Sequence, residues 1–105
     1  RPALDVFAEN MGEVAVDGLP QSGLEFPMVF KEEDILVGRI IVAIDGKNLV
    51  MSAPIKKSSH FQFSFGIPKN AIAHSRSIYQ KNKEKNIEAI MAFSCIARLT
   101  FLQSD

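Results

Sequence analysis

Apolar side chains recur at the three- and four-residue spacing of an amphipathic helix in three parts of the chain. The predicted helices cover residues 3–12, residues 68–83 and the segment from Ser94 onward. Gly12 stands where the first helix can end, because glycine tolerates the backbone conformation of a helix C-cap. Pro68 suits the first turn of the second helix. We therefore expect one long helix and two short terminal ones.

Apolar, β-branched runs predict strands in much of the remaining chain. The predicted strands cover residues 24–30, 35–44, 48–52, 60–65 and 87–93. The strand of residues 35–44 is almost entirely apolar, so we expect it to be buried on both faces. Pro27 cannot donate a hydrogen bond to a neighbouring strand, which predicts a sheet edge for the first strand. Residues 45–48, Asp-Gly-Lys-Asn, predict a hairpin turn.

Strict alternation in residues 60–65 places Phe61, Phe63 and Phe65 on one face of their strand, which we expect to face the core. The helix of residues 68–83 can supply the layer that covers them. Residues 13–23 are rich in glycine and are expected to form a loop. Together the elements predict an α+β two-layer domain with a mostly antiparallel sheet, one long packing helix and short terminal helices.

Length and charge narrow the class of protein. The 105 residues are enough for a single domain, and 47 % hydrophobic residues are typical of a globular chain. Twelve basic and twelve acidic residues cancel, which argues against a nucleic-acid partner. No apolar run approaches the roughly 18 residues that span a membrane, and a single cysteine is compatible with the cytoplasm. Because the chain opens on Arg1 and not on Met, we expect it to be a piece of a longer protein.

A small polar cluster follows the apolar residues 87–93 and contains Ser94, Cys95 and Arg98. The pattern suggests a core strand that delivers these side chains to one end of a sheet. Cys95 at a helix N-terminus near Arg98 could be a reactive or ligand-contacting thiol, or simply a small buried hydrophobe. Ser94 is expected to be the N-cap of the last helix. Arg98 could contact a ligand or form a surface ion pair.

Arg39 lies within the most apolar strand, where burial of its charge is costly unless an acid or a ligand satisfies it. Its guanidinium could grip a carboxylate on a ligand. The alternatives are a structural pair with Asp45 or Glu88, or an edge strand that leaves the side chain in water.

The two histidines, His60 and His74, stand on polar faces and are expected to be exposed. Either could ligate haem, but no apolar pocket around them is evident from the sequence. Two histidines and one cysteine at wide spacing do not form a zinc motif, and no cofactor is assigned. No acid–base pair or nucleophile constellation emerges, so we do not expect an enzyme.

Four segments, in order along the chain, resemble the FIST C-terminal domain family. They are the opening ALDVF helix that ends in Met-Gly, the FPM segment at residues 26–28, the VGRII strand with its IDG turn at residues 37–46, and the FSCIAR cluster at residues 93–98. The family domain usually continues into a further Gly-aromatic strand and a His-Asn strand, so the resemblance implies a fragment that lacks the final strands.

The resemblance implies a non-catalytic sensory domain that binds a small ligand, such as an amino acid or another carboxylate. The implied ligand contacts are Arg39, Ser94, Cys95 and Arg98. The implied partner is a covalently linked output domain, such as a diguanylate cyclase, a histidine kinase or a chemotaxis domain. The alternatives are a protein-interaction or structural module, which could form a homodimer, and a haem-based gas sensor.

Overall fold

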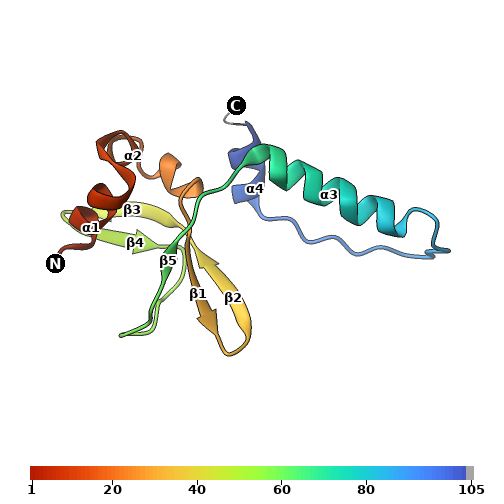
Figure 1. Cartoon of the computed structure of the whole chain (residues 1–105), viewed down its shortest axis with the longest axis horizontal. Helices are drawn as coiled ribbons and strands as arrows, with labels where there is room; N and C mark the ends of the chain where they lie inside the picture. Colours follow the sequence, from red (N-terminus) through yellow and green to blue (C-terminus); the bar gives the residue numbers. More distant parts are fainter. Residues whose placement is uncertain (104–105) are drawn as a thin grey trace. The chain divides into compact units, whose positions relative to one another are not determined.

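The computed structural model describes residues 1–103, which form two compact units, Arg1–Phe65 and the segment from Gly66 onward (Figure 1). The fold is mixed α+β, with antiparallel strand pairs, one 15-residue helix and shorter helices near the two ends. This confirms the predicted fold class. Within residues 1–103, no helix is long and apolar enough to cross a membrane.

Three helices begin the first unit: α1 (Ala3–Met11), α2 (Glu13–Asp17) and the 3-10 helix η1 (Gln21–Leu24). Gly12 confirms its predicted role, because it has a φ of 86° and its amide donates to the carbonyl of Ala8 at 2.8 Å. The prediction of a loop over residues 13–23 is wrong. The segment forms α2 and most of η1 instead, and Ala15 is buried in the core.

The first sheet has the strand order β2-β1-β5, with β1 (Met28–Glu32) between β2 (Ile35–Arg39) and β5 (Gln62–Phe63). The edge position predicted for the strand of residues 24–30 is therefore wrong. Pro27 lies just before β1, where no amide is needed. Its carbonyl instead accepts hydrogen bonds from the amide of Ser64 at 3.0 Å and from the Ser64 hydroxyl at 2.7 Å.

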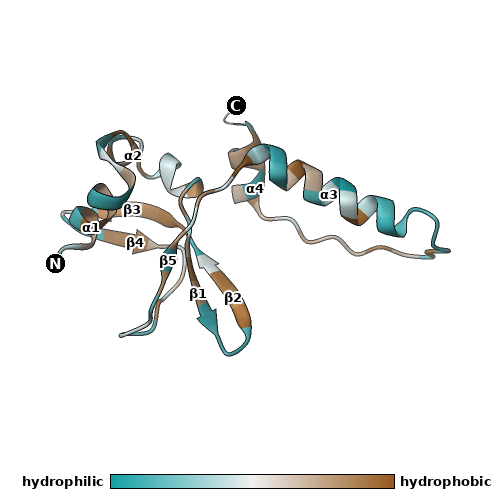
Figure 2. Ribbon diagram, viewed as in Figure 1, coloured by the Kyte–Doolittle hydropathy of each residue, from teal (hydrophilic) through white to brown (hydrophobic). Residues whose placement is uncertain are grey.

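The apolar run of residues 35–44 is not one strand. It divides at Ile40 into β2 and β3 (Ile41–Asp45), and β3 pairs with β4 (Asn48–Met51) in a separate two-stranded sheet. The predicted hairpin turn is confirmed, with Gly46 at a φ of 58°. The prediction that the strand of residues 35–44 is buried on both faces is also wrong, because Ile41 is the one buried residue of β3. Figure 2 shows β2 and β3 as apolar strands.

The core of the first unit gathers around Phe7 and Ile41, which are 0 % and 1 % exposed. The Phe7 ring contacts Phe63 edge-on, with ring centroids 5.9 Å apart. Phe63 thus faces the core as predicted, but Phe61 and Phe65 are exposed. The strand that was to align all three is only two residues long, so it does not hold them on one face.

The second unit contains α3 (Pro68–Asn82) and α4 (Ile96–Gln103). The helix predicted at residues 68–83 is confirmed, although none of its residues is buried. The strand predicted at residues 87–93 is wrong, because these residues have no strand partner in the described chain and Phe93 is 90 % exposed. Inside this unit α4 packs closely on Gly66, where an added Cβ would lie 2.7 Å from Cζ of Phe101.

Candidate functional site

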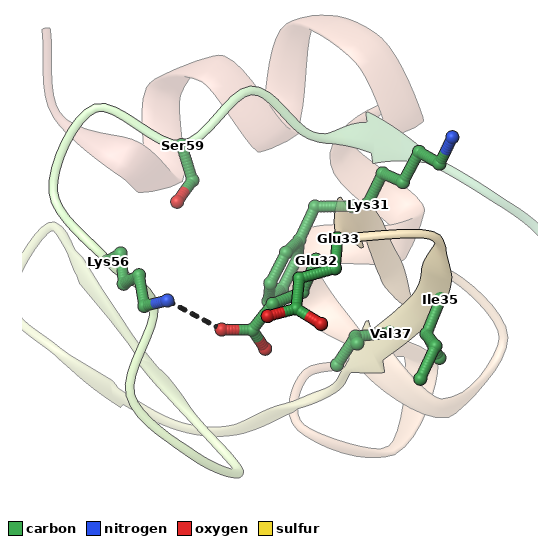
Figure 3. Close-up of a pocket in the computed structure, with 8 residues that line it drawn as sticks. Lys31, Glu32, Glu33, Ile35, Val37, Lys56 and Ser59 are labelled. Carbon is green, nitrogen blue, oxygen red and sulfur yellow. Dashed lines mark ion pairs between the residues drawn. The ribbon is translucent and has the colours of Figure 1, made fainter.

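A groove of about 480 Å³ lies beside the β1–β2 hairpin in the first unit. Strand β1, the hairpin turn, β2 and the segment after β4 all contribute side chains to it. The lining residues are Phe30, Lys31, Glu32, Glu33, Ile35, Val37, Lys56 and Ser59. Figure 3 shows that Lys56 and Glu32 reach toward one another across the hollow. The groove therefore combines an apolar floor with charges of both signs.

The hairpin geometry explains why these side chains converge. Cross-strand neighbours on an antiparallel pair share a face, and the register sets Phe30 opposite Val37 and Glu32 opposite Ile35. Glu33 begins the tight turn with a φ of 55°, a conformation that few residues other than glycine adopt readily. Such local strain is often retained at functional sites.

One ion pair dominates the electrostatics of the groove. Nζ of Lys56 lies 2.8 Å from Oε1 of Glu32. The Lys56 hydrogen bond, and then its charge, hold the pKa of the Glu32 carboxyl below its ordinary value, and the Arg39 charge acts in the same direction. The same pair raises the pKa of Lys56. Both side chains remain in contact with water, so the charges of a ligand can compete for either of them.

Arg39, predicted as a ligand contact, lies on the groove face of the hairpin, since it follows Val37 by two residues on β2. Its guanidinium carbon is 5.5 Å from the centroid of the Phe30 ring, and Nη1 donates to the carbonyl of Gly38 at 3.1 Å. Its Nε is buried and has no hydrogen-bond partner among the described residues. A structural pair with Asp45, one of the alternatives for Arg39, is not formed.

Ser94, Cys95 and Arg98 lie together in the second unit, whereas Arg39 belongs to the first. Helix α4 begins at Ile96, so Cys95 and not Ser94 directly precedes its first residue, and the predicted N-cap is wrong. Cys95 is exposed, which excludes a buried hydrophobe. The Arg98 side chain donates from Nη2 to the hydroxyl of Ser75 on α3 and does not form the expected ion pair in the described chain.

The cluster does not stand at the end of a core strand, because residues 87–93 form no strand in the structure. That interpretation of the polar cluster is wrong. What the structure brings together is local: the Arg98 amide donates to the carbonyl of Cys95 at 3.1 Å. Cys95 and Arg98 are three residues apart at the start of α4, and this spacing within one helical turn accounts for the contact.

Both histidines are exposed, as predicted. His60 lines a second groove of about 350 Å³ in the first unit, together with Leu36 and Phe61. His74 lies on α3. Among residues 1–103, no three His, Cys, Asp or Glu side chains gather in a way that could hold a metal ion. A haem ligand from either histidine stays a prediction.

Comparison with known protein families matches residues 3–105 to the FIST C domain, which is nearly the whole chain. The chain belongs to the FIST C domain family. No curated protein and no solved structure gives a significant match. FIST C domains are generally sensory, non-catalytic modules of signalling proteins.

The groove of this FIST C domain includes five polar residues that the sequence did not single out: Lys31, Glu32, Glu33, Lys56 and Ser59. The sequence features that could have pointed to these residues are weak. A charged turn at residues 31–34 and a pair of lysines at residues 56–57 are both usual on surfaces. Their meeting depends on how the segment after β4 returns to the hairpin, which side-chain spacing alone does not determine.

Proposed function

We propose that this FIST C domain binds a small ligand that carries both a carboxylate and an ammonium group, with amino acids as the first class to test. The observation that carries this proposal is the facing of Lys56 and Glu32 over an apolar floor (Figure 3). A small zwitterion carries a carboxylate that can pair with Lys56 and an ammonium that can pair with Glu32. The groove volume is also within the usual range of small-molecule sites.

The groove offers a partner for each part of such a ligand. The ammonium of Lys56 and the hydroxyl of Ser59 can donate to the ligand carboxylate. Glu32, freed from Lys56, can accept from the ligand ammonium. An apolar ligand side chain would rest against Phe30 and Val37. Binding would thus exchange an ion pair within the protein for two between protein and ligand.

Arg39 would add selectivity at the rim of this site. It stacks on the Phe30 ring that lines the groove, and no carboxylate among residues 1–103 lies within ion-pair distance of it. A planar guanidinium suits a second carboxylate on the ligand. We therefore expect acidic amino acids to bind more tightly than neutral ones.

Signalling would follow from the loss of the Lys56–Glu32 pair, which joins the segment after β4 to the hairpin. A ligand that binds only the rearranged groove shifts the population toward that state. In the cytoplasm, a covalently linked output domain such as a diguanylate cyclase or a histidine kinase would respond to the shift. This shift in population requires no catalysis by the FIST C domain itself.

A thermal-shift screen of amino acids and small carboxylates, followed by calorimetry of the hits, tests the proposal. Lys56→Met should weaken binding of every hit about tenfold or more, since a charged hydrogen bond is lost. Lys57→Met is the matched control, because Lys57 is an adjacent exposed lysine outside the groove lining. Equal binding by the parent and Lys56→Met would contradict the proposed site.

The same screen tests the ligand contacts proposed from the family resemblance, Ser94, Cys95 and Arg98. Their exposure and their place in the second unit make Arg98→Ala a clean comparison with Arg39→Ala. Loss of binding with Arg39→Ala alone assigns the ligand to the first unit. Loss with Arg98→Ala alone would assign it to the second unit and would exclude the hairpin groove.

A second candidate function is a protein-interaction module. The observation that favours it is the exposure of large apolar side chains in residues 87–96, among them Ile90, Met91 and Phe93. Exposed apolar side chains in such density often mark an interaction surface. Replacement of Met91 by Lys would abolish binding to a partner of that kind without changing the binding of a ligand in the hairpin groove.

A further inference from the structure

The β1–β2 hairpin has an open edge. Among residues 1–103, β2 pairs with β1 alone, so its other side presents backbone groups that no strand satisfies. Ile35 and Leu36 on this strand are 68 % and 74 % exposed. Edge strands are usually blocked by charged side chains, proline or a bulge. In β2 only the last residue, Arg39, is charged, and the strand contains no proline and no bulge in its pairing with β1.

The hairpin geometry determines which backbone groups lie on the open edge. Two residues form the turn, and Glu32–Ile35 is the closing pair. In a hairpin of this kind the closing pair and every second pair after it exchange hydrogen bonds, so Phe30–Val37 does so. The amide and carbonyl groups of Leu36 and Gly38 therefore point away from β1. The Gly38 carbonyl accepts from Nη1 of Arg39 at 3.1 Å, a solvent-exposed contact that a pairing strand would replace.

We propose that β2 pairs in antiparallel register with β2 of a second copy of this chain, about a two-fold axis at Val37. This register sets Leu36 of each copy opposite Gly38 of the other. An added Cβ at Gly38 would meet nothing within 4 Å, so the space over Gly38 can receive the Leu36 side chain. The proposal does not depend on the ligand proposed above.

The charges in this register are complementary. Arg39 of each copy stands opposite Ile35 of the other and diagonally across from Glu33, within the reach of a long side chain. Arg39 forms no ion pair in the described chain, so Glu33 of the second copy would give its guanidinium an acid at ion-pair distance. The two-fold axis repeats the pair of Arg39 and Glu33 at both ends of the ladder. Between residues 35 and 39, this register places no like charges directly opposite one another.

The pairing would also join two short sheets into one. Each copy contributes the strand order β2-β1-β5, so the result is a continuous six-stranded sheet with β2 and its copy at the centre. Sheets of about this size are common. The exposed apolar side chains of β2 would then lie beside those of the second copy on the two faces of the sheet.

Light scattering and sedimentation of the full chain test the proposal, and we expect a dimer. Leu36→Lys should weaken dimerisation about tenfold or more, since it removes an apolar contact twice in each dimer. Gly38→Pro should do the same, because it removes an amide that faces the second copy and not β1. Val14→Lys, at an 87 % exposed position of α2 outside the hairpin, is the matched control and should leave the dimer intact. Ile90→Lys tests the apolar surface of the second unit and should also leave the dimer intact.

A cysteine at Val37 tests the register. The two copies of residue 37 would form a non-hydrogen-bonded pair with Cα atoms about 4.5 Å apart, a separation that a disulfide can span. In a Cys95→Ser background, Val37→Cys should form a covalent dimer at least tenfold faster than Ile35→Cys, whose two copies lie far apart.

Several results would overturn the proposal. The proposal is wrong if the parent chain stays monomeric at high concentration. It is also wrong if the chain forms a dimer that Leu36→Lys and Gly38→Pro leave unchanged. A dimer lost with Ile90→Lys would place the interface in the second unit. Equal cross-linking of the two cysteine variants would refute the register. Circular dichroism of each variant shows whether the fold is retained.

Discussion

At the scale of single residues, the chemistry of the first unit rests on one solvated pair, Lys56 and Glu32. Exposed ion pairs add little stability, so this pair is better suited to a change of partner than to holding the fold together. Arg39 has a related character. Its stacking on Phe30 positions the guanidinium while leaving its charge without an acid within ion-pair distance in residues 1–103.

The Lys56–Glu32 pair predicts a pH dependence. Because the pKa of Glu32 is lowered in the folded state, its contribution to stability is complete above its ordinary value of 4.5 and is lost as the pH falls through the lowered pKa. The pKa of Lys56 is raised, so its contribution is complete below its ordinary value of 10.5 and is lost as the pH rises through the raised pKa. The stabilisation is therefore flat between these limits.

Thermal unfolding of the parent and Lys56→Met checks this dependence. The parent should have a slightly higher Tm in neutral solution, and the gap should close in acid, as the pH falls through the lowered pKa of Glu32. Lys57→Met should show no comparable gap at either pH. A difference between the parent and Lys56→Met that is as wide in acid as at neutral pH would contradict the assignment.

At the scale of elements, close backbone packing positions η1 on β3. Gly23 of η1 is buried, and a Cβ added there would lie 3.0 Å from both Cβ and the carbonyl oxygen of Ile41. Ile41 is itself 1 % exposed, so it has no room to retreat. Glycine at position 23 is thus a requirement of the contact between two elements and not of a turn.

Gly23→Ala should lower the free energy of unfolding by about 1–3 kcal/mol, because the added methyl group overpacks the contact with Ile41. Gly38→Ala is the matched control, since a Cβ there meets nothing within 4 Å. It should leave stability within about 0.5 kcal/mol of the parent in dilute solution. Denaturant unfolding monitored by circular dichroism measures both, and similar losses in the two variants would contradict the packing argument.

At the scale of the whole molecule, the buried core belongs to one unit. All of the buried apolar residues in the described chain lie between Phe7 and Ile41, whereas neither α3 nor α4 has a buried residue. The first unit accordingly carries the packing that resists unfolding. The second unit consists of helices and an extended apolar segment with little interior of its own.

This distribution predicts a contrast between two phenylalanines. Phe7→Ala should destabilise the first unit by about 3–5 kcal/mol, since it empties a fully buried site. Phe93→Ala should change stability by less than about 0.5 kcal/mol, because Phe93 is 90 % exposed. Comparable losses in both, measured by chemical denaturation, would show that Phe93 is buried in solution.

The sequence predicted the helix ends and turns that local residue preferences specify. It did not predict the features that depend on contacts between distant segments. Gly12 ends α1, Gly46 forms the hairpin turn and Pro68 begins α3, each through its own backbone preference. The division of the apolar run at Ile40 could not be predicted in this way. It depends on Ser52, whose amide donates to the Ile40 carbonyl at 2.9 Å and whose hydroxyl accepts from the Ile40 amide at 3.2 Å.

The candidate site shows the same limit. Arg39 stood out because a charge in an apolar run is costly, and the structure places it beside the groove. Lys56 and Ser59 lie in a segment with no periodicity, and only the return of that segment to the hairpin brings them to Glu32. Family membership, in contrast, was evident from short motifs and did not require knowledge of the fold.

The solvent-facing thiol of Cys95 has a practical consequence. Because the chain contains no other cysteine, a maleimide fluorophore will attach at a single known position, immediately before α4. Its emission would register changes in the surroundings of that helix in real time. A change in emission on titration with a metabolite would then show that the second unit responds to that compound, with no need for an output domain or an enzymatic assay.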